Sequence, residues 1–132
     1  MMKNWLIALC LLMLAACSNN WDDQLDGKWQ LQTVEQGGTV LAVDTIYYNF
    51  QNTLFMYQTY SPASDKYRKS YGFNALEGDK LLLELDNNPQ PVHLFLPFTD
   101  WTSTKRTFLI EKHSGSQLII SSDGRRYTFR KF

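Results

Sequence analysis

One short run near the N-terminus carries residues whose types and spacing predict a defined reaction. Leu14, Ala15 and Ala16 stand directly before Cys17. Small residues in front of a cysteine are typical of a bacterial lipobox, after which the signal peptide is removed and the new N-terminal thiol receives acyl chains such as palmitate. Lys3 and the apolar run 5–13 resemble the charged and apolar parts of such a signal, which is too short to span a bilayer.

We therefore predict a lipoprotein signal peptide over residues 1–16 and an acyl anchor on Cys17. The alternative is an ordinary secretory signal with an incidental cysteine. Asp22–Asp23 resembles the acidic export signals of some lipoproteins, although these acids do not directly follow Cys17. The prediction places the protein at the outer membrane, on its periplasmic or cell-surface side.

The rest of the chain offers little that could catalyse a reaction. Both cysteines precede residue 18, so the folded part has no thiol for a disulfide, a metal or a nucleophilic attack. His93 and His113 are the only histidines, and neither is accompanied by a Gly-x-Ser-x-Gly elbow. Glu84 and Asp86 fit the solvated face of one strand better than a pair of catalytic acids. We expect no enzyme activity, no cofactor and no metal.

Charge excludes one class of partner. The chain has 13 Lys and Arg residues and 13 Asp and Glu residues, which gives no formal net charge. Nucleic acids attract proteins with a basic excess, so no nucleic-acid partner is expected. The expected contact with the membrane is the N-terminal lipid.

The pattern after residue 26 predicts one all-β domain. Residues 17–26 are mainly polar and acidic and suit a flexible tether, which leaves residues 27–132 for the domain. Short segments rich in aliphatic, β-branched and aromatic residues alternate apolar with polar positions between Gly, Asn, Asp and Ser turns. The predicted strands, one of which is a candidate loop or helix instead, cover residues 28–35, 44–50, 53–60, 67–76, 80–86, 92–96, 105–113, 117–122 and 125–131.

Successive hairpins favour an antiparallel up-and-down β-barrel of about eight strands, because closure removes the exposed sheet edges. A sandwich of two sheets is the structural alternative. A barrel of this size is either filled by its own side chains or holds one small ligand. The aromatic residues placed to fill or to line it are Tyr48, Phe50, Tyr71, Phe73, Phe108, Tyr127 and Phe129.

The segment 87–104 interrupts the strand pattern. It holds three of the four prolines, together with Phe95, Phe98 and Trp101. A connection of this length in a compact domain is more often functional than not. Two interpretations stay open: it is a lid or docking surface, or Leu94, Phe95 and Phe98 fill the open end of the barrel as core.

The first strand also carries a family resemblance. Gly27 and Trp29 form the Gly-x-Trp pattern that resembles the N-terminal signature of lipocalins, and segment 127–132 looks like the last strand of lipocalin-like lipoproteins of Gram-negative gut anaerobes. The resemblance implies that Trp29 closes the narrow end of the barrel. It also implies that an arginine of the last strand, Arg130 or else Arg126, lies across the indole.

We therefore expect a membrane-anchored lipoprotein with a lipocalin-like barrel that binds a small apolar or amphipathic ligand. The alternative is a non-catalytic accessory subunit that docks a protein partner of the cell envelope through the stretch from Phe95 to Trp101.

Overall fold

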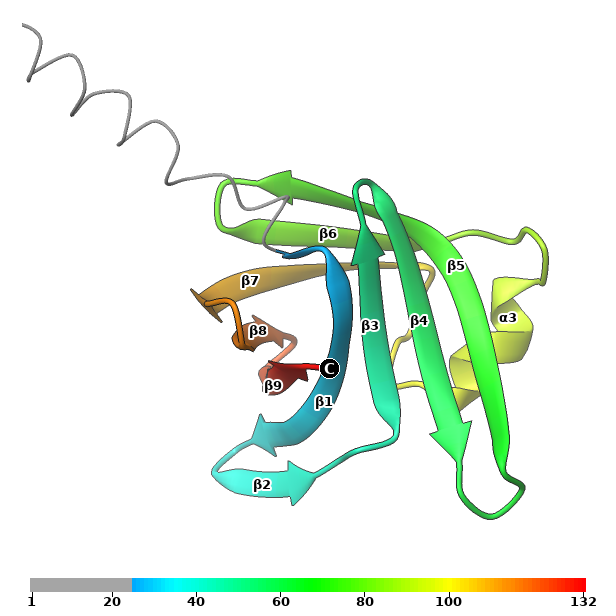
Figure 1. Cartoon of the computed structure of the whole chain (residues 1–132), viewed down its shortest axis with the longest axis horizontal. Coiled ribbons are helices and arrows are strands. Elements are labelled where there is room, and N and C mark those ends of the chain that lie inside the picture. Colours follow the sequence, from blue (N-terminus) through cyan, green and yellow to red (C-terminus); the bar gives the residue numbers. More distant parts are fainter. Residues whose placement is uncertain (1–24) are drawn as a thin grey trace, which may run out of the picture.

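The computed structural model describes residues 25–132 (Figure 1). The predicted signal peptide, Cys17 and most of the predicted tether lie outside these residues, so those predictions stay untested. The described elements are β1 (Gly27–Gln36), β2 (Thr39–Ala42), β3 (Ile46–Gln51), β4 (Leu54–Ser61), β5 (Lys66–Glu77), β6 (Lys80–Leu85), α3 (Val92–Phe95), the 3₁₀ helix η1 (Leu96–Phe98), β7 (Lys105–His113), β8 (Gln117–Ser122) and β9 (Arg125–Lys131).

The strands form one antiparallel sheet that closes on itself. Strands β3 to β9 pair in sequence order, β1 pairs with β3, and β1 also pairs with β9 over most of its length. Strand β2 forms a hairpin with β1 and pairs with the C-terminal half of that strand. The result is a closed eight-stranded barrel, which confirms the predicted fold and excludes the sandwich.

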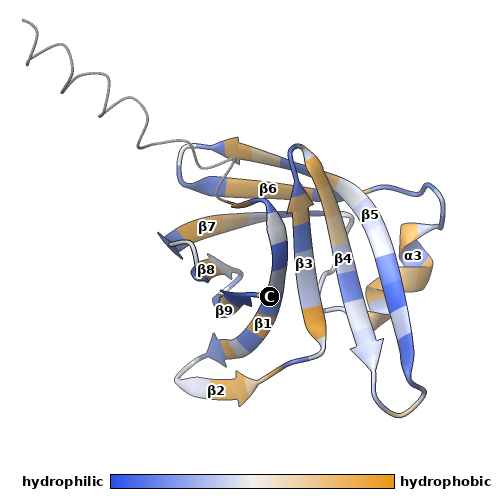
Figure 2. Ribbon diagram, in the orientation of Figure 1, coloured by the Kyte–Doolittle hydropathy of each residue, from blue (hydrophilic) through white to orange (hydrophobic). Residues whose placement is uncertain are grey.

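Alternation of side chains builds the interior of this barrel. On β6 the side chains of Leu81, Leu83 and Leu85 are buried, while Glu84 between them is exposed. Strand β9 buries Tyr127 and Phe129 in the same manner. Figure 2 shows the resulting change from hydrophobic to hydrophilic residues along the ribbons. Burial of these apolar side chains is the main source of stability for the domain.

Two predicted elements differ in the structure. Residues 92–96 are helical and not a strand, because Pro89, Pro91 and Pro97 cannot donate to a sheet ladder. The amide of Val92 instead donates to the side-chain oxygen Oδ1 of Asn87 at 2.9 Å. The short strand β2, after the turn at Gly37–Gly38, was not predicted. Among residues 25–132 no helix has the length and hydropathy needed to cross a bilayer.

Strand β5 corrects a predicted orientation. Tyr71 and Phe73 were placed inside the barrel, but they lie on its outer face and are 45% and 49% exposed. The inward positions belong to Ser70, Gly72 and Asn74. Strands β5 and β6 approach so closely at Gly72 that a Cβ there would collide with the main-chain oxygen of Glu84. Because side chains alternate along a strand and Gly72 faces the interior, its two neighbours Tyr71 and Phe73 point outward.

The first residues of β1 close one end of the barrel, here called the closed end. Trp29 is fully buried and donates its indole N–H to the main-chain oxygen of Leu25 at 2.8 Å. The cation over its ring is Lys131, whose Nζ lies 4.6 Å from the ring centroid. Gly27 has a φ of 126°, which favours glycine. The expectation that Arg130 covers the indole was wrong, because Lys131 is the residue of β9 that pairs with Trp29.

Arg130 has a different partner. It pairs with Gln30, and its Nε donates to the Oε1 atom of that side chain at 3.1 Å. Arg126, the other candidate, donates to Glu111 with its Nε at 2.8 Å. Neither arginine therefore serves as the cation over the buried indole.

Candidate functional site

The opposite end of the barrel, here called the mouth, contains a pocket of about 480 Å³. The mouth is the end at which β1 continues into β2 and at which the connection between β6 and β7 folds over the strands. The wall from β1 to β3 is apolar, and the hydroxyl-bearing rings of Tyr48 and Tyr57 lie among its lining residues. The pocket is lined by Leu31, Val34, Gln36, Thr39, Leu41, Val43, Ile46, Tyr48, Tyr57, Phe98, Thr99, Asp100, Arg125 and Tyr127.

Aromatic rings fill the barrel away from the mouth. The ring centroids of Tyr48 and Phe129 are 4.9 Å apart, and that of Phe55 is 5.2 Å from Tyr48. Trp101, only 4% exposed, stacks on Phe55 with ring planes 11° apart and donates its indole N–H to the hydroxyl of Tyr48 at 3.1 Å. The barrel is therefore packed in the middle and open at the mouth, so the available volume lies at one end.

The predicted ligand-contacting residues fall into three groups. Tyr48 and Tyr127 line the mouth pocket. Phe50, Phe108 and Phe129 are buried in the interior but are not among the lining residues of this pocket. Tyr71 and Phe73, on the outer face of β5, are excluded from the barrel interior.

The segment 87–104 contributes some of its side chains to the core and leaves others exposed. Val92, Phe95 and Trp101 are buried and belong to the core. Leu94 and Phe98 do not fill the barrel, since they are 61% and 48% exposed. The expectation that Trp101 forms part of an exposed docking surface was therefore wrong. The residues between Phe98 and Trp101 carry the segment back over the mouth.

A buried polar cluster borders the mouth pocket. Arg106 is 8% exposed and donates from Nη1 to Oδ1 of Asp100 at 3.1 Å and from Nη2 to the hydroxyl of Tyr127 at 2.7 Å. Arg125 donates from Nη1 to Oδ2 of Asp100 at 3.1 Å, and the hydroxyl of Tyr127 donates to the same oxygen. The carboxylate of Asp100 thus ties the connection 87–104 to β7 and β9 through charged hydrogen bonds.

The surroundings of Arg106 keep it charged inside the barrel. Burial alone lowers the pKa of Arg106, but its hydrogen bond to Tyr127 and the charge of Asp100 outweigh this effect and raise the pKa. The guanidinium carbon also lies 4.8 Å from the ring centroid of Phe108 and 5.1 Å from that of Tyr127. Such contacts favour a guanidinium that is removed from water.

The tyrosines of the site stay neutral. Burial raises the pKa of Tyr48, and the nearby charge of Asp100 adds to the rise. Burial likewise raises the pKa of Tyr57 well above its usual value. For Tyr127, burial and the hydrogen bond to Asp100 both raise the pKa. The hydroxyls therefore act as hydrogen-bond donors and acceptors and do not supply negative charge to a ligand.

Sequence reasoning missed Asp100 and Arg106. A signal for Arg106 is present: it occupies an inward position of β7, in step with the buried Phe108 and Ile110. A charged residue on the apolar face of an alternating strand requires a buried partner. Asp100 carries no such signal, because it lies in an irregular segment. Among residues 25–132 no group of three or more His, Cys, Asp or Glu side chains could hold a metal ion.

Comparison with known proteins agrees with this geometry. The family model described as the lipocalin-like domain matches residues 12–132. The chain belongs to the lipocalin-like domain family. The eight-stranded barrel, its Gly-x-Trp closed end and its open mouth are thus those of a lipocalin-like protein.

Two solved structures resemble this lipocalin-like chain along nearly their whole length. One is a lipocalin-like protein from Bacteroides uniformis ATCC 8492, with a TM-score of 0.71 and 29% identity, covering 83% of this chain and 99% of that one. The other is a protein from Bacteroides eggerthii DSM 20697, with a TM-score of 0.69 and 25% identity, covering 82% of this chain and 99% of that one. A comparison with curated proteins gave no match.

Proposed function

We propose that this lipocalin-like barrel binds one small, mainly apolar molecule in the mouth pocket. The observation that carries the proposal is the pocket of about 480 Å³ between β1, β2, β3 and the connection 87–104. This volume lies within the range of small-molecule sites, which are concave, mostly apolar and furnished with a few fixed polar groups. The packed rings beneath the pocket supply a rigid floor.

The polar cluster limits the chemistry of the head group. The guanidinium groups of Arg106 and Arg125 face carboxylates: Asp100 bridges both, and Asp123 lies 3.5 Å from Nε of Arg106. The positive and negative charges at the rim are balanced within the protein. A charged group on the ligand would therefore add little to the binding free energy there. We infer an amphipathic ligand with an uncharged hydroxyl or carbonyl head at the rim and its apolar part against Leu31, Val34 and Ile46.

The ligand site can be tested with 1-undecanol as an uncharged probe and undecanoate as its charged counterpart. We expect 1-undecanol to bind more tightly than undecanoate at pH 7, measured by titration calorimetry. Val34→Trp places a large ring in the pocket and should weaken binding of the alcohol at least about tenfold, because an overfilled pocket excludes the ligand. The matched control is Val40→Trp, at an exposed position of β2 that does not line the pocket.

Circular dichroism would verify that both variants keep the fold. Equal affinity of the two tryptophan variants for 1-undecanol would contradict the proposed site. Absence of any heat of binding up to the solubility limit of the alcohol would contradict carriage of a small apolar ligand altogether.

The proposal includes an acyl anchor at Cys17 that holds the barrel at the outer membrane. Each buried methylene of an acyl chain contributes about 0.8 kcal/mol to membrane binding, so several chains attach a protein almost permanently. We expect Cys17→Ser to move the protein from the membrane fraction to the soluble fraction of its native host. The control Ser18→Ala should leave it with the membranes. A Cys17→Ser protein that still sediments with the outer membrane would refute the acyl anchor, without bearing on the ligand site.

A further inference from the structure

The first half of β5 has a free edge within the described part of the chain. Strand β4 pairs with β5 from Ser61↔Lys66 to Leu54↔Phe73, whereas the β6 register begins only at Gly72↔Leu85. One further hydrogen bond, from the amide of Asp86 to the oxygen of Tyr71 at 2.8 Å, ends this ladder. Beyond it, the chain leaves the sheet toward α3. No strand among residues 25–132 pairs with the β6-facing edge of residues 67–70.

The main-chain groups on this edge can be assigned from the ladder. In an antiparallel strand the N–H and C=O of one residue point to the same side, and the side alternates along the chain. The oxygen of Tyr71 points toward Asp86, while the amide of Asn74 points toward Thr53 on the other side. The N–H and C=O groups of Tyr67 and Lys69 therefore point to the free edge. Such groups are a template for one more strand.

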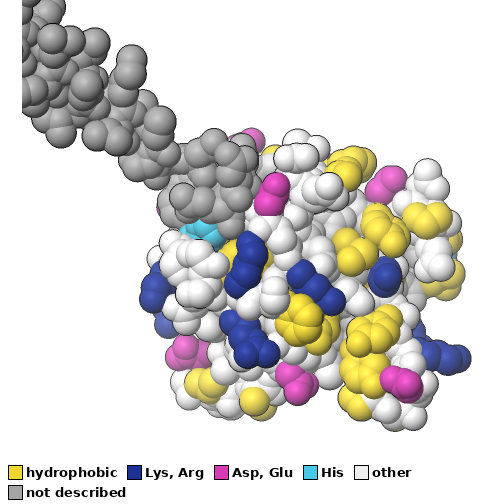
Figure 3. All heavy atoms as spheres, in the orientation of Figure 1, with side chains coloured by type: hydrophobic (Ala, Val, Ile, Leu, Met, Phe, Trp, Pro, Cys, Tyr) yellow, Lys and Arg dark blue, Asp and Glu magenta, His cyan; other side chains and the backbone are white. Residues whose placement is uncertain are grey.

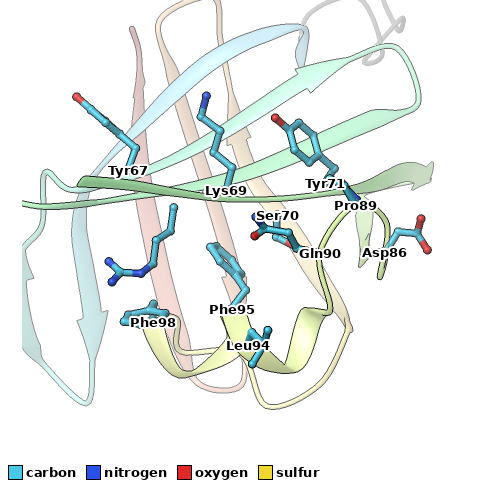
Figure 4. A pocket seen from close by; sticks show the side chains of 11 residues that line it. Tyr67, Lys69, Ser70, Tyr71, Asp86, Pro89, Gln90, Leu94, Phe95 and Phe98 are labelled. Carbon is cyan, nitrogen blue, oxygen red and sulfur yellow. The ribbon is translucent and has the colours of Figure 1, made fainter. Parts of the chain in front are cut away.

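A groove of about 470 Å³ runs along this edge (Figure 4). The side chains of Tyr67, Lys69 and Tyr71 stand on one side of β5, and those of Leu94, Phe95 and Phe98 lie on the other side, on the helical segment. Arg68 points to the same side of β5 as Phe98, and its guanidinium carbon lies 3.9 Å from the ring centroid of Phe98. A strand laid in the groove would meet Tyr67, Lys69 and Tyr71 on the outside. On the inside it would meet the apolar side chains of Leu94 and Phe98, with Arg68 beside them.

We propose that this groove binds an extended peptide segment of a partner protein as an added strand beside β5. The chemistry of the walls defines the guest. Residues on one face of the added strand would be apolar, against Leu94 and Phe98, and the alternate residues would be acidic, beside Lys69. Affinity comes from main-chain hydrogen bonds and specificity from alternate side chains, as in other cases of strand addition. The groove shares only Phe98 with the lining of the mouth pocket, and the variants below change Lys69, which lines the groove alone. Failure of this proposal would therefore leave the proposed function intact.

Other observations favour a peptide over a second copy of the barrel. The helical segment α3–η1 supplies Leu94, Phe95 and Phe98 to the same groove and so lies beside the free edge. A second barrel would have to bring its own β5 together with its neighbouring strands. The exposed hydrophobic side chains beside the groove, seen in yellow among Lys and Arg in Figure 3, supply further contact area on the outer face.

The probe for this site is the peptide acetyl-Val-Asp-Val-Asp-Val-amide, followed on ¹⁵N-labelled protein. We expect the amide signals of Tyr67, Lys69 and Tyr71 to shift and to exchange more slowly with solvent. The peptide acetyl-Val-Lys-Val-Lys-Val-amide should bind weakly, because Arg68 and Lys69 repel it. Two further versions of the acidic peptide carry N-methyl groups, one on its aspartates and the other on its valines. In an added strand only one of these two sets of amides faces β5. Only one of the two methylated peptides should therefore lose binding.

Two variants of one residue separate the main chain from the side chain. Lys69→Pro removes the edge-facing N–H, and proline is tolerated on strand edges. It should weaken binding about tenfold, which is the loss of one main-chain hydrogen bond. Lys69→Ala keeps that N–H and should weaken binding only about threefold at low salt.

No shift of these amides at about 1 mM peptide would overturn the proposal. Equal binding by Lys69→Pro and Lys69→Ala would do the same, because the edge would then play no part. Equal loss with both N-methylated peptides, or with neither, would also overturn strand addition. Shifts of the same amides with protein concentration alone would assign the edge to a second copy of this chain.

Discussion

Replacing Trp101 with alanine is expected to lower the free energy of unfolding by about 3–5 kcal/mol, the usual cost of removing a large buried ring. The indole is 4% exposed, stacks on Phe55 and donates to the hydroxyl of Tyr48 at 3.1 Å. Its loss leaves a cavity beneath the mouth pocket and removes one hydrogen bond from the buried hydroxyl of Tyr48. Chemical denaturation followed by circular dichroism measures the change.

The matched control lies three residues away. Phe98→Ala removes a ring of the same connection that is 48% exposed, and it should cost less than about 1 kcal/mol. Trp101→Phe keeps an aromatic ring but loses the hydrogen bond to Tyr48, so its cost should fall between the two. If Trp101→Ala unfolded no more easily than Phe98→Ala, the interior position of Trp101 would be refuted and an exposed docking role restored.

Arg106→Met is expected to lower the free energy of unfolding by about 3 kcal/mol, the cost of removing one partner of a buried ion pair. The substitution keeps an unbranched apolar stem but removes the donors to Asp100 and Tyr127. Asp100 would keep Arg125 as its partner, so the connection 87–104 would be tied to β9 alone. Thermal and chemical unfolding would both report the loss.

Arg126→Met is the matched control for this variant. Arg126 donates to Glu111 at 2.8 Å and lies 3.5 Å from Glu35, but its side chain is about half exposed. Solvent-exposed ion pairs contribute about 1 kcal/mol or less. A loss with Arg106→Met no greater than that with Arg126→Met would contradict the role of the buried cluster at the mouth.

The fold could be predicted because in most strands the apolar residues recur at every second position and so indicate the buried face. On β9 apolar and polar residues alternate, on β6 they do so except at Leu82, and tight turns separate the hairpins. The orientation of β5 could not be read in the same way. Its aromatic residues form a regular alternation that suggests an inward face, while the inward residues are Ser70, Gly72 and Asn74. A glycine inside a strand can mark a close approach of another backbone, but the sequence does not show that the approaching strand at Gly72 is β6.

The site was harder to predict than the fold, because it depends on contacts between distant segments. Tyr48 and Tyr127 could be assigned to the interior from alternation alone. The polar cluster at the mouth joins Asp100, in the connection 87–104, to Arg106 on β7 and to Arg125 and Tyr127 on β9. A pairing of this kind has no local pattern. The same reason explains Trp101, whose place in the interior depends on the path of an irregular connection.

The family signature was predicted only in part. Gly27 and Trp29 occupy the closed end as the resemblance implies, but the cation over the indole is one residue further along β9 than expected. A shift of one residue exchanges the inner and outer faces of a strand. The choice between Arg130 and Lys131 therefore depends on the strand register, which composition does not reveal.

The most direct test of the ligand site is a measurement of where a bound alkyl chain lies. The protein would be labelled at its methyl groups and mixed with ¹³C-labelled 1-undecanol, and nuclear Overhauser effects between the two would be recorded. We predict contacts from the alkyl chain to the methyl groups of Leu31, Val34 and Ile46 at the mouth. Contacts to Leu54 or Leu94 on the outer surface in their place, or no contacts to any methyl group, would contradict a ligand site inside the barrel.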